Sequence, residues 1–138
     1  MKIDHIGIAV ASLDDAKGFY EALGLACSGE EEVADQGVRV RFFPVGDSRV
    51  ELLESTDPEG PIGKFVAKKG PGLHHLCMEV PDVRKAIAVL KSRGFSLIDA
   101  EPKVGTGGHL VAFVHPKSTG GVLLELSQKG SGTERESV

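Results

Sequence analysis

Hydrophobic and polar residues alternate near the start of the chain, and the same alternation returns 70 residues later. In residues 5–10, three large aliphatic side chains share one face of an extended chain, and His5 begins the opposite face. Residues 75–80 repeat this arrangement and begin at His75. A period of two residues predicts a β-strand. The chain therefore contains two related strands, each of which opens on a histidine.

A helix is predicted after each of these strands. Ser12 and Asp82 are typical N-cap residues, and apolar residues recur at helical spacing over residues 13–23 and 83–90. The glycines expected to end the two helices are Gly24 and Gly94. A shared strand, helix and terminating glycine indicates an internal repeat rather than chance similarity.

Three short strands complete each copy of the repeat. They are expected at residues 28–33, 38–45 and 49–54 in the first copy and at 97–101, 108–114 and 121–126 in the second. The fold class is therefore α+β, built from two tandem βαβββ modules. We expect one domain over residues 1–128, with modules at about 3–54 and 73–127. A linker at 55–72 carries a short helix (61–69), and residues 129–138 form a polar, disordered tail.

Equivalent positions of the two modules can be compared as pairs. His5 pairs with His75, and in each last strand a glutamate stands between apolar neighbours, at Glu51 and Glu125. Such a glutamate points away from the face that its neighbours bury. Two histidines and two glutamates from a duplicated fold can converge at the concave centre of a combined sheet, which predicts a metal site.

Each of these residues alone has a simpler explanation. A single strand histidine is more often a hydrogen-bonded structural residue, and a strand glutamate usually faces solvent. Their recurrence in matched places favours a shared metal site, and imidazole with carboxylate suits Zn, Mn, Co, Ni or Fe better than Ca. His74 is the contrast, because it shares a face with Leu76 and Met78 and is expected to be structural.

Composition narrows the class of protein. The 138 residues carry a net charge of −4, which argues against a general nucleic-acid or membrane-surface binder. The two cysteines form neither a C-x-x-C motif nor a disulfide framework, so a reduced compartment is expected. No apolar stretch approaches the roughly 20 residues that span a bilayer. We therefore expect a cytoplasmic protein.

Three segments carry a resemblance to a known family. Residues 4–10, 72–80 and 115–126 resemble the methylmalonyl-CoA epimerases of the vicinal-oxygen-chelate superfamily, also called glyoxalase/bleomycin-resistance/dioxygenase. The resemblance implies two modules that form a cup-shaped, partly closed mixed sheet around one divalent ion (Co, Mn, Zn or Ni). It also implies a homodimer and an acyl-CoA thioester substrate. The ligands it implies are His5, His75, Glu125 and, at a position that is Gln or Glu, Glu51.

The reaction implied by the resemblance is the interconversion of (2R)- and (2S)-methylmalonyl-CoA, a step of propionate metabolism. Removal of the C2 proton gives an enolate, and epimerisation needs an acid/base group on each face of it. The resemblance makes Glu125 one base. In relatives the other is a glutamate just before a Gln-Gly-Val segment, where this chain has Ala34 and Asp35. The second base is unassigned among Asp35, Glu32, Glu51 and a water molecule.

Other assignments remain open from the sequence. His115 and Lys117 are weak candidates for substrate contact, because a surface position near a loop end is the simpler explanation. A glyoxalase I-like lactoylglutathione lyase would use the same four ligands, and an extradiol-type dioxygenase needs only two histidines and one carboxylate on iron. A metal-free binding protein of the same fold has no use for the paired histidines and glutamates.

Overall fold

The computed structural model describes residues 1–130, so most of the tail expected at 129–138 lies outside the described residues. The chain divides into a first unit, residues 4–74, and a second unit, residues 1–3 together with the chain from residue 75 onward. Among the helices of residues 1–130, none has the length and apolar character that crossing a bilayer requires.

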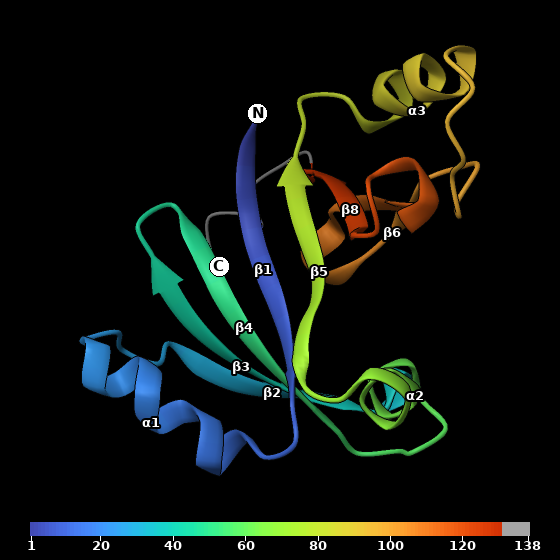
Figure 1. The fold of residues 1–138 in the computed structure, drawn as a ribbon. Helices are drawn as coiled ribbons and strands as arrows, with labels where there is room; N and C mark the ends of the chain where they lie inside the picture. Colours follow the sequence, from blue (N-terminus) through green and yellow to red (C-terminus); the bar gives the residue numbers. More distant parts are fainter. Residues whose placement is uncertain (131–138) are drawn as a thin grey trace. The chain divides into compact units, whose positions relative to one another are not determined.

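The first unit contains a four-stranded sheet and two helices (Figure 1). Its elements are β1 (Lys2–Val10, in this unit from Asp4 on), α1 (Leu13–Leu23), β2 (Gly29–Val33), a 3₁₀ turn (Ala34–Gln36), β3 (Val38–Val45), β4 (Ser48–Ser55) and α2 (Pro61–Lys69). The strand order is β2-β3-β4-β1. β1 runs parallel to β4, whereas the other neighbours are antiparallel.

Local signals of the sequence set the ends of these elements. The Ser12 side chain accepts a hydrogen bond from the Asp15 amide at 3.3 Å, which confirms the predicted N-cap of α1. Gly24 ends the helix in the left-handed conformation at φ 109°. A two-residue turn at Gly46 joins β3 to β4, because Val45 pairs with Ser48.

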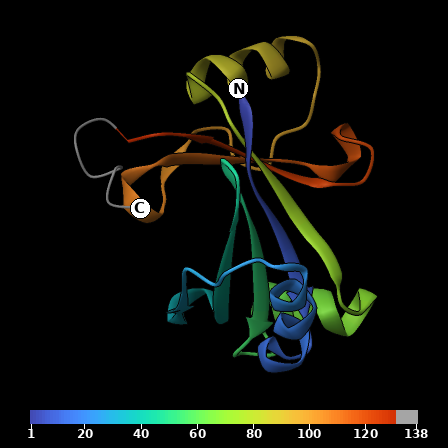
Figure 2. The ribbon, with the colours of Figure 1, turned by 90° about the vertical axis from the view of Figure 1, so that its left-hand side faces the viewer.

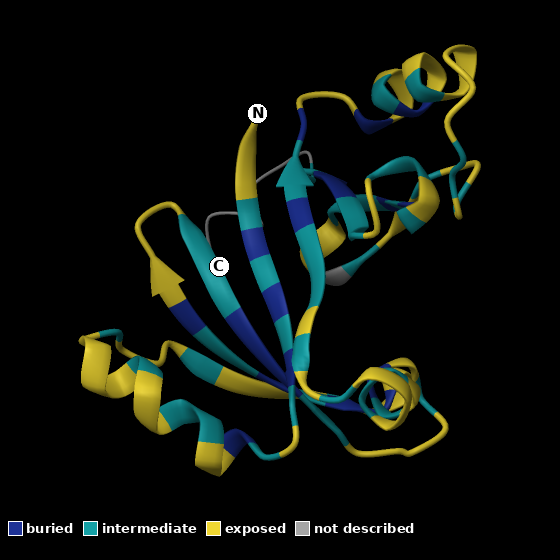
Figure 3. Cartoon of the chain, in the orientation of Figure 1, coloured by how far each residue is buried: buried dark blue, intermediate teal, exposed yellow. Residues whose placement is uncertain are grey.

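Helices cover both faces of the four-stranded sheet of the first unit. On one face Leu13 of α1 packs with Phe43 and Leu52; on the other, Ile62 of α2 packs with Ala9 and Leu53. Dark blue buried positions therefore alternate with teal ones along β1 (Figure 3). His5 in β1 is held inside the protein, whereas Lys2 at the start of the strand is exposed.

The second unit repeats this plan with a single helix. Its elements are β5 (Gly72–Glu79, in this unit from His75 on), α3 (Val83–Ser92), β6 (Lys103–Val104), β7 (Leu110–Val114) and β8 (Leu123–Gln128), with 3₁₀ turns at Thr106–Gly108 and Pro116–Ser118. The strand order is β5-β8-β7-β6, with β5 parallel to β8. Val83 and Ile87 of α3 pack on Val114 and Leu126, and Figure 2 shows this helix lying over the orange and red strands.

The three strands predicted for the end of the second module differ from those observed. The segment 97–101 is not a strand, since only Leu97 forms a single bridge, to Val114. The Asp99 carboxylate accepts a hydrogen bond from the Phe113 amide at 2.8 Å, which takes the donor that a paired strand would use. The edge strand is instead β6.

The predicted strand 121–126 is displaced to residues 123–128. Gly120 and Gly121 have φ values of 84° and 103°, so they form a left-handed turn before β8 begins. The strand predicted at 108–114 begins two residues later than expected, after the 3₁₀ turn at Thr106–Gly108.

The two modules nevertheless share one register. In β1 and β4, His5 pairs with Arg49 and Gly7 with Glu51. In β5 and β8, the corresponding pairs are His75 with Leu123 and Cys77 with Glu125. Both modules have the order βαβββ, so the predicted α+β fold of two tandem modules is confirmed.

Candidate active site

The first unit holds a histidine and a glutamate side by side on neighbouring parallel strands. Nδ1 of His5 in β1 lies 3.5 Å from Oε2 of Glu51 in β4. Both residues are buried, at 8% exposure each. The register explains the contact, because Glu51 pairs with Gly7, two residues along β1 from His5. We call His5 and Glu51 the first His–Glu pair.

Two charged residues that the sequence analysis missed surround this pair. The Asp4 carboxylate lies 2.8 Å from Nδ1 of His5. Nη2 of Arg49 donates to Oε2 of Glu51 at 2.8 Å and to Oδ2 of Asp4 at 3.2 Å. Sequence signals for both existed. Asp4 directly precedes the histidine, and Arg49 lies two residues before Glu51, hence on the same face of β4.

These contacts favour one tautomer of His5. Nη2 of Arg49 lies 3.3 Å from Nδ1, but the Asp4 oxygen is closer, at 2.8 Å. A lone pair on Nδ1 would repel that carboxylate, so Nδ1 carries the proton and donates it to Asp4. The lone pair of the neutral ring is then on Nε2. A carboxylate on the second ring nitrogen is the usual partner of a metal-binding histidine.

Arg49 engages only one oxygen of Glu51. Its Nε and Nη2 both donate to Oε2, at 3.2 and 2.8 Å, and Oε1 takes part in neither contact. Burial alone would lower the pKa of the Arg49 guanidinium, but the hydrogen bond and the charge of Glu51, joined by Asp4, outweigh it and raise the pKa. Arg49 is therefore a permanent positive charge beside Glu51.

The second unit holds the equivalent pair. Nε2 of His75 in β5 lies 3.7 Å from Oε1 of Glu125 in β8, and both side chains are largely buried, at 12% and 15% exposure. We call these two residues the second His–Glu pair. At the position of Arg49 the second module has Leu123, which faces His75 across the parallel ladder.

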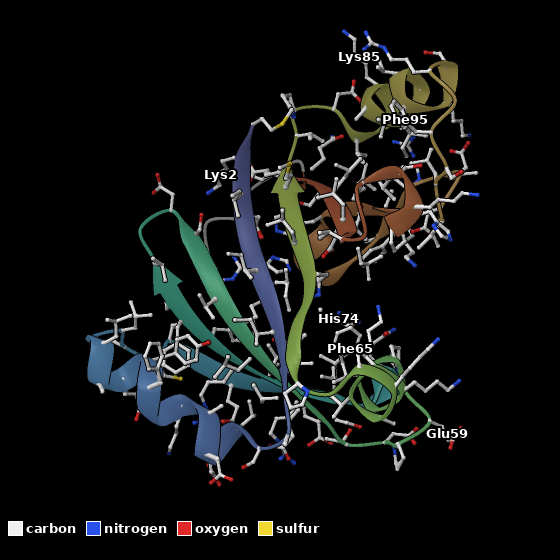
Figure 4. The ribbon with its side chains drawn as sticks, viewed as in Figure 1. Lys2, Glu59, Phe65, His74, Lys85 and Phe95 are labelled. Carbon is white, nitrogen blue, oxygen red and sulfur yellow. The ribbon has the colours of Figure 1, made fainter. Side chains whose placement is uncertain are left out.

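His74 has a different environment from its neighbour. Its ring meets the ring of Phe65 in α2 edge to face, with 5.0 Å between centroids, and Figure 4 labels both side chains. Burial lowers the pKa of His74, so the neutral ring is favoured. This contact supports the structural role predicted for His74, although its partner Phe65 was not foreseen.

The other sequence candidates lie in exposed positions. Asp35 is exposed in the turn before β3, and Glu32 of β2 forms an ion pair with Arg39 at 3.7 Å. His115 and Lys117 are exposed at the turn before β8, where Nδ1 of His115 accepts a hydrogen bond from the Lys117 amide at 3.1 Å. The Glu32 contact joins two paired strands and the His115 contact lies within a turn, and neither assigns chemistry to these residues.

The donors of the two His–Glu pairs fit a divalent transition metal. Each pair supplies one imidazole and one carboxylate in a buried setting, and this mixture of nitrogen and oxygen donors suits Zn, Mn, Co or Ni. The Asp4 contact adds the outer hydrogen bond that such a histidine requires.

Comparison with known proteins shows the family of the chain. Residues 4–113 match the Glyoxalase/Bleomycin resistance protein/Dioxygenase superfamily. The mitochondrial methylmalonyl-CoA epimerase of Homo sapiens is 38% identical over 92% of this chain and 73% of its own length. The chain belongs to the methylmalonyl-CoA epimerase family. The ethylmalonyl-CoA/methylmalonyl-CoA epimerase of Cereibacter sphaeroides is 36% identical over 92% of this chain and 97% of its own.

A solved structure from the same family shares the fold. The Streptomyces coelicolor methylmalonyl-CoA epimerase, in complex with 2-nitronate-propionyl-CoA, superimposes with a TM-score of 0.82 at 36% identity. The match covers 95% of this chain and 96% of that one. Both modules of the present chain therefore have counterparts in an epimerase that holds an acyl-CoA analogue.

Proposed function

We propose that this protein interconverts (2R)- and (2S)-methylmalonyl-CoA. The observation that carries the proposal is the buried His–Glu pair present at the same register in both modules. Membership of the epimerase family supports the same reaction. Ethylmalonyl-CoA is a second candidate substrate, because one relative is named for both acyl-CoA thioesters.

The four residues of the two pairs, His5, Glu51, His75 and Glu125, together would hold one divalent ion, which we propose to be Co, Mn, Zn or Ni. When bound, this ion would stabilise the negative charge that develops on the thioester oxygen as the C2 proton leaves. The Asp4 hydrogen bond would keep His5 in the tautomer that ligation requires.

Proton transfer at C2 is assigned to carboxylates of this chain. Glu125 would take the proton from one face of C2, and a second group would return it to the other face. Asp35, Glu32 and Glu51 remain the candidates for the second group. Glu51 suits this role least, since Arg49 already engages its carboxylate, whereas Asp35 directly precedes the Gln36-Gly37-Val38 segment.

We further infer a homodimer that works in the cytoplasm in propionate metabolism. The family resemblance supports the dimer and the pathway. The isolated cysteines, exposed Cys27 and buried Cys77, support a reducing compartment.

The decisive experiment is proton–deuterium exchange at C2 of methylmalonyl-CoA in heavy water, with metal content measured on the same sample. We expect exchange into both stereoisomers by a protein that carries about one divalent ion per chain. Asp35→Asn and Glu32→Gln, assayed in parallel, identify the second base as the variant that exchanges one stereoisomer only. Turnover of a glutathione hemithioacetal without C2 exchange would replace the proposal with a glyoxalase I-like lyase.

A further inference from the structure

The two His–Glu pairs differ in their charge. Counting 74 residues on from Glu51 leads to Glu125, and the same step leads from Arg49 to Leu123. The register confirms the correspondence, since His5 faces Arg49 and His75 faces Leu123. At this matched place the first module therefore has a cation and the second module has an uncharged side chain.

The cation is held at short range. Arg49 lies 2.8 Å from Glu51 and 3.2 Å from Asp4, and the side chains of the two acids are 10% and 21% exposed. The Arg49 side chain is 36% exposed, so its charge is partly screened, but carboxylates at the depth of Glu51 and Asp4 are screened less than charges on an open surface. One positive charge therefore offsets part of two negative charges next to His5.

We propose that Arg49 is a charge-compensating positioning residue, which lets Glu51 serve as a metal ligand through Oε1 with little more negative charge than a neutral amide would bring. The inference rests on the metal site proposed above. Both donors of Arg49 end on Oε2, so Glu51 can bind the cation through one oxygen and a divalent ion through the other. At the place of Arg49 the second module has the uncharged Leu123, and Glu125 is the residue proposed above for proton transfer.

The proposal predicts opposite effects for two substitutions. Removal of Arg49 leaves the full charge of Glu51 facing the ion, so the ion binds more tightly. Removal of the Glu51 charge leaves Arg49 to repel the ion, so the ion binds more weakly. Outer-shell partners commonly change metal affinity by about 10–100-fold, and we expect roughly tenfold in each direction. Together the two substitutions restore the charge balance.

The test is calorimetric titration of the metal-free protein with Co²⁺, Zn²⁺ and Mn²⁺ at one pH, without substrate. The substitution Arg49→Leu is chosen because the second module has Leu123 at the corresponding position. We expect Arg49→Leu to bind about tenfold more tightly and Glu51→Gln about tenfold more weakly. The double variant should bind within about threefold of the unchanged protein. Arg49→Lys keeps the charge and loses the planar fork, so it should also stay within about threefold.

A matched control is Arg41→Leu, because Arg41 of β3 has its own ion pairs with Glu30 and Asp14 in the same unit. Its metal affinity should not change. The inference is overturned if Arg49→Leu binds as the unchanged protein does, if both single variants bind more weakly, or if Arg49→Lys behaves like Arg49→Leu. If the unchanged protein takes up no ion, the proposed function fails. That result differs from one in which the unchanged protein binds the ion and the Arg49 variants bind it with the same affinity.

Discussion

The backbone amide of Val83 donates a hydrogen bond to Oε1 of Gln128, 2.8 Å away. In the first module the Leu13 amide donates to Oε1 of Glu54 at 2.7 Å. In both cases the first amide of a helix, which has no acceptor within the helix, is bound by a side chain near the end of the last strand of the module. The duplication therefore extends to a tertiary contact between helix and sheet.

This contact should contribute measurably to stability. Glu54→Ala and Gln128→Ala leave the first helical amide without its acceptor, and each should lower the free energy of unfolding by about 0.5–2 kcal/mol, as loss of a helix cap does. Glu54→Gln introduces the residue that the second module has at this place and keeps the acceptor oxygen. It should therefore cost only about a few tenths of the unfolding free energy that Glu54→Ala costs. Urea denaturation measures all three. Equal losses for Glu54→Gln and Glu54→Ala would show that charge, not the hydrogen bond, is what matters.

Replacement of either histidine of the two pairs should remove the bound ion. We expect His5→Ala and His75→Ala to weaken metal binding by more than about 100-fold, beyond the effect of losing an outer-shell partner, and to abolish C2 exchange in a folded protein. Elemental analysis measures the metal content of each variant, and circular dichroism shows whether the variant is folded. His109→Ala, on the loop before β7, is the control that should keep its metal. Full metal stoichiometry in both His5→Ala and His75→Ala would exclude the proposed site.

His74 should affect stability instead. His74→Ala removes the edge-to-face contact with Phe65, and an aromatic pair with its buried area accounts for roughly 1–3 kcal/mol of unfolding free energy. Metal stoichiometry should be nearly unchanged. Thermal unfolding and metal analysis on the same sample separate the two effects. A loss of metal as complete as in His75→Ala would make His74 a ligand.

The sequence predicted those parts of the fold whose signals are local. The Ser12 and Asp82 caps lie where expected, because each is set by a few neighbouring residues. The segment 97–101 was misjudged, since Asp99 uses its side chain to bind the Phe113 amide. Such competition between side chain and backbone depends on a residue 14 positions away, which a local pattern does not contain.

The candidate site was predicted only as far as the repeat reaches. His5 with His75 and Glu51 with Glu125 were found because both modules carry them in the same register. Asp4 and Arg49 were missed because the second module has His74 and Leu123 at those places. Residues that recur in both modules stand out in the sequence. Charged residues that occur in one module only, such as Arg49, have no matching residue in the other module, and their role follows from their contacts in the structure.

Glu51 and Glu125 occupy equivalent positions in the two modules, but the proposed reaction gives them different roles. An amide oxygen can still bind a metal ion but cannot accept a proton from C2. Glu51→Gln should therefore keep the ion at saturating metal, together with much of the turnover. Glu125→Gln should lose epimerisation by roughly 10²–10⁴-fold, the usual contribution of a general acid–base group.

Deuterium exchange from each stereoisomer distinguishes the roles of Glu51 and Glu125. If Glu125 serves one face of C2, Glu125→Gln should retain slow deuterium exchange from one stereoisomer of methylmalonyl-CoA and lose it from the other, because the second base is still present. Exchange followed by mass spectrometry from each pure stereoisomer, at saturating metal, tests this directly. Equal impairment of the two Gln variants would remove the distinction between ligand and base. An inactive Glu51→Gln beside an active Glu125→Gln would exchange the two roles, and Arg49 would then lie beside the base instead of beside a ligand.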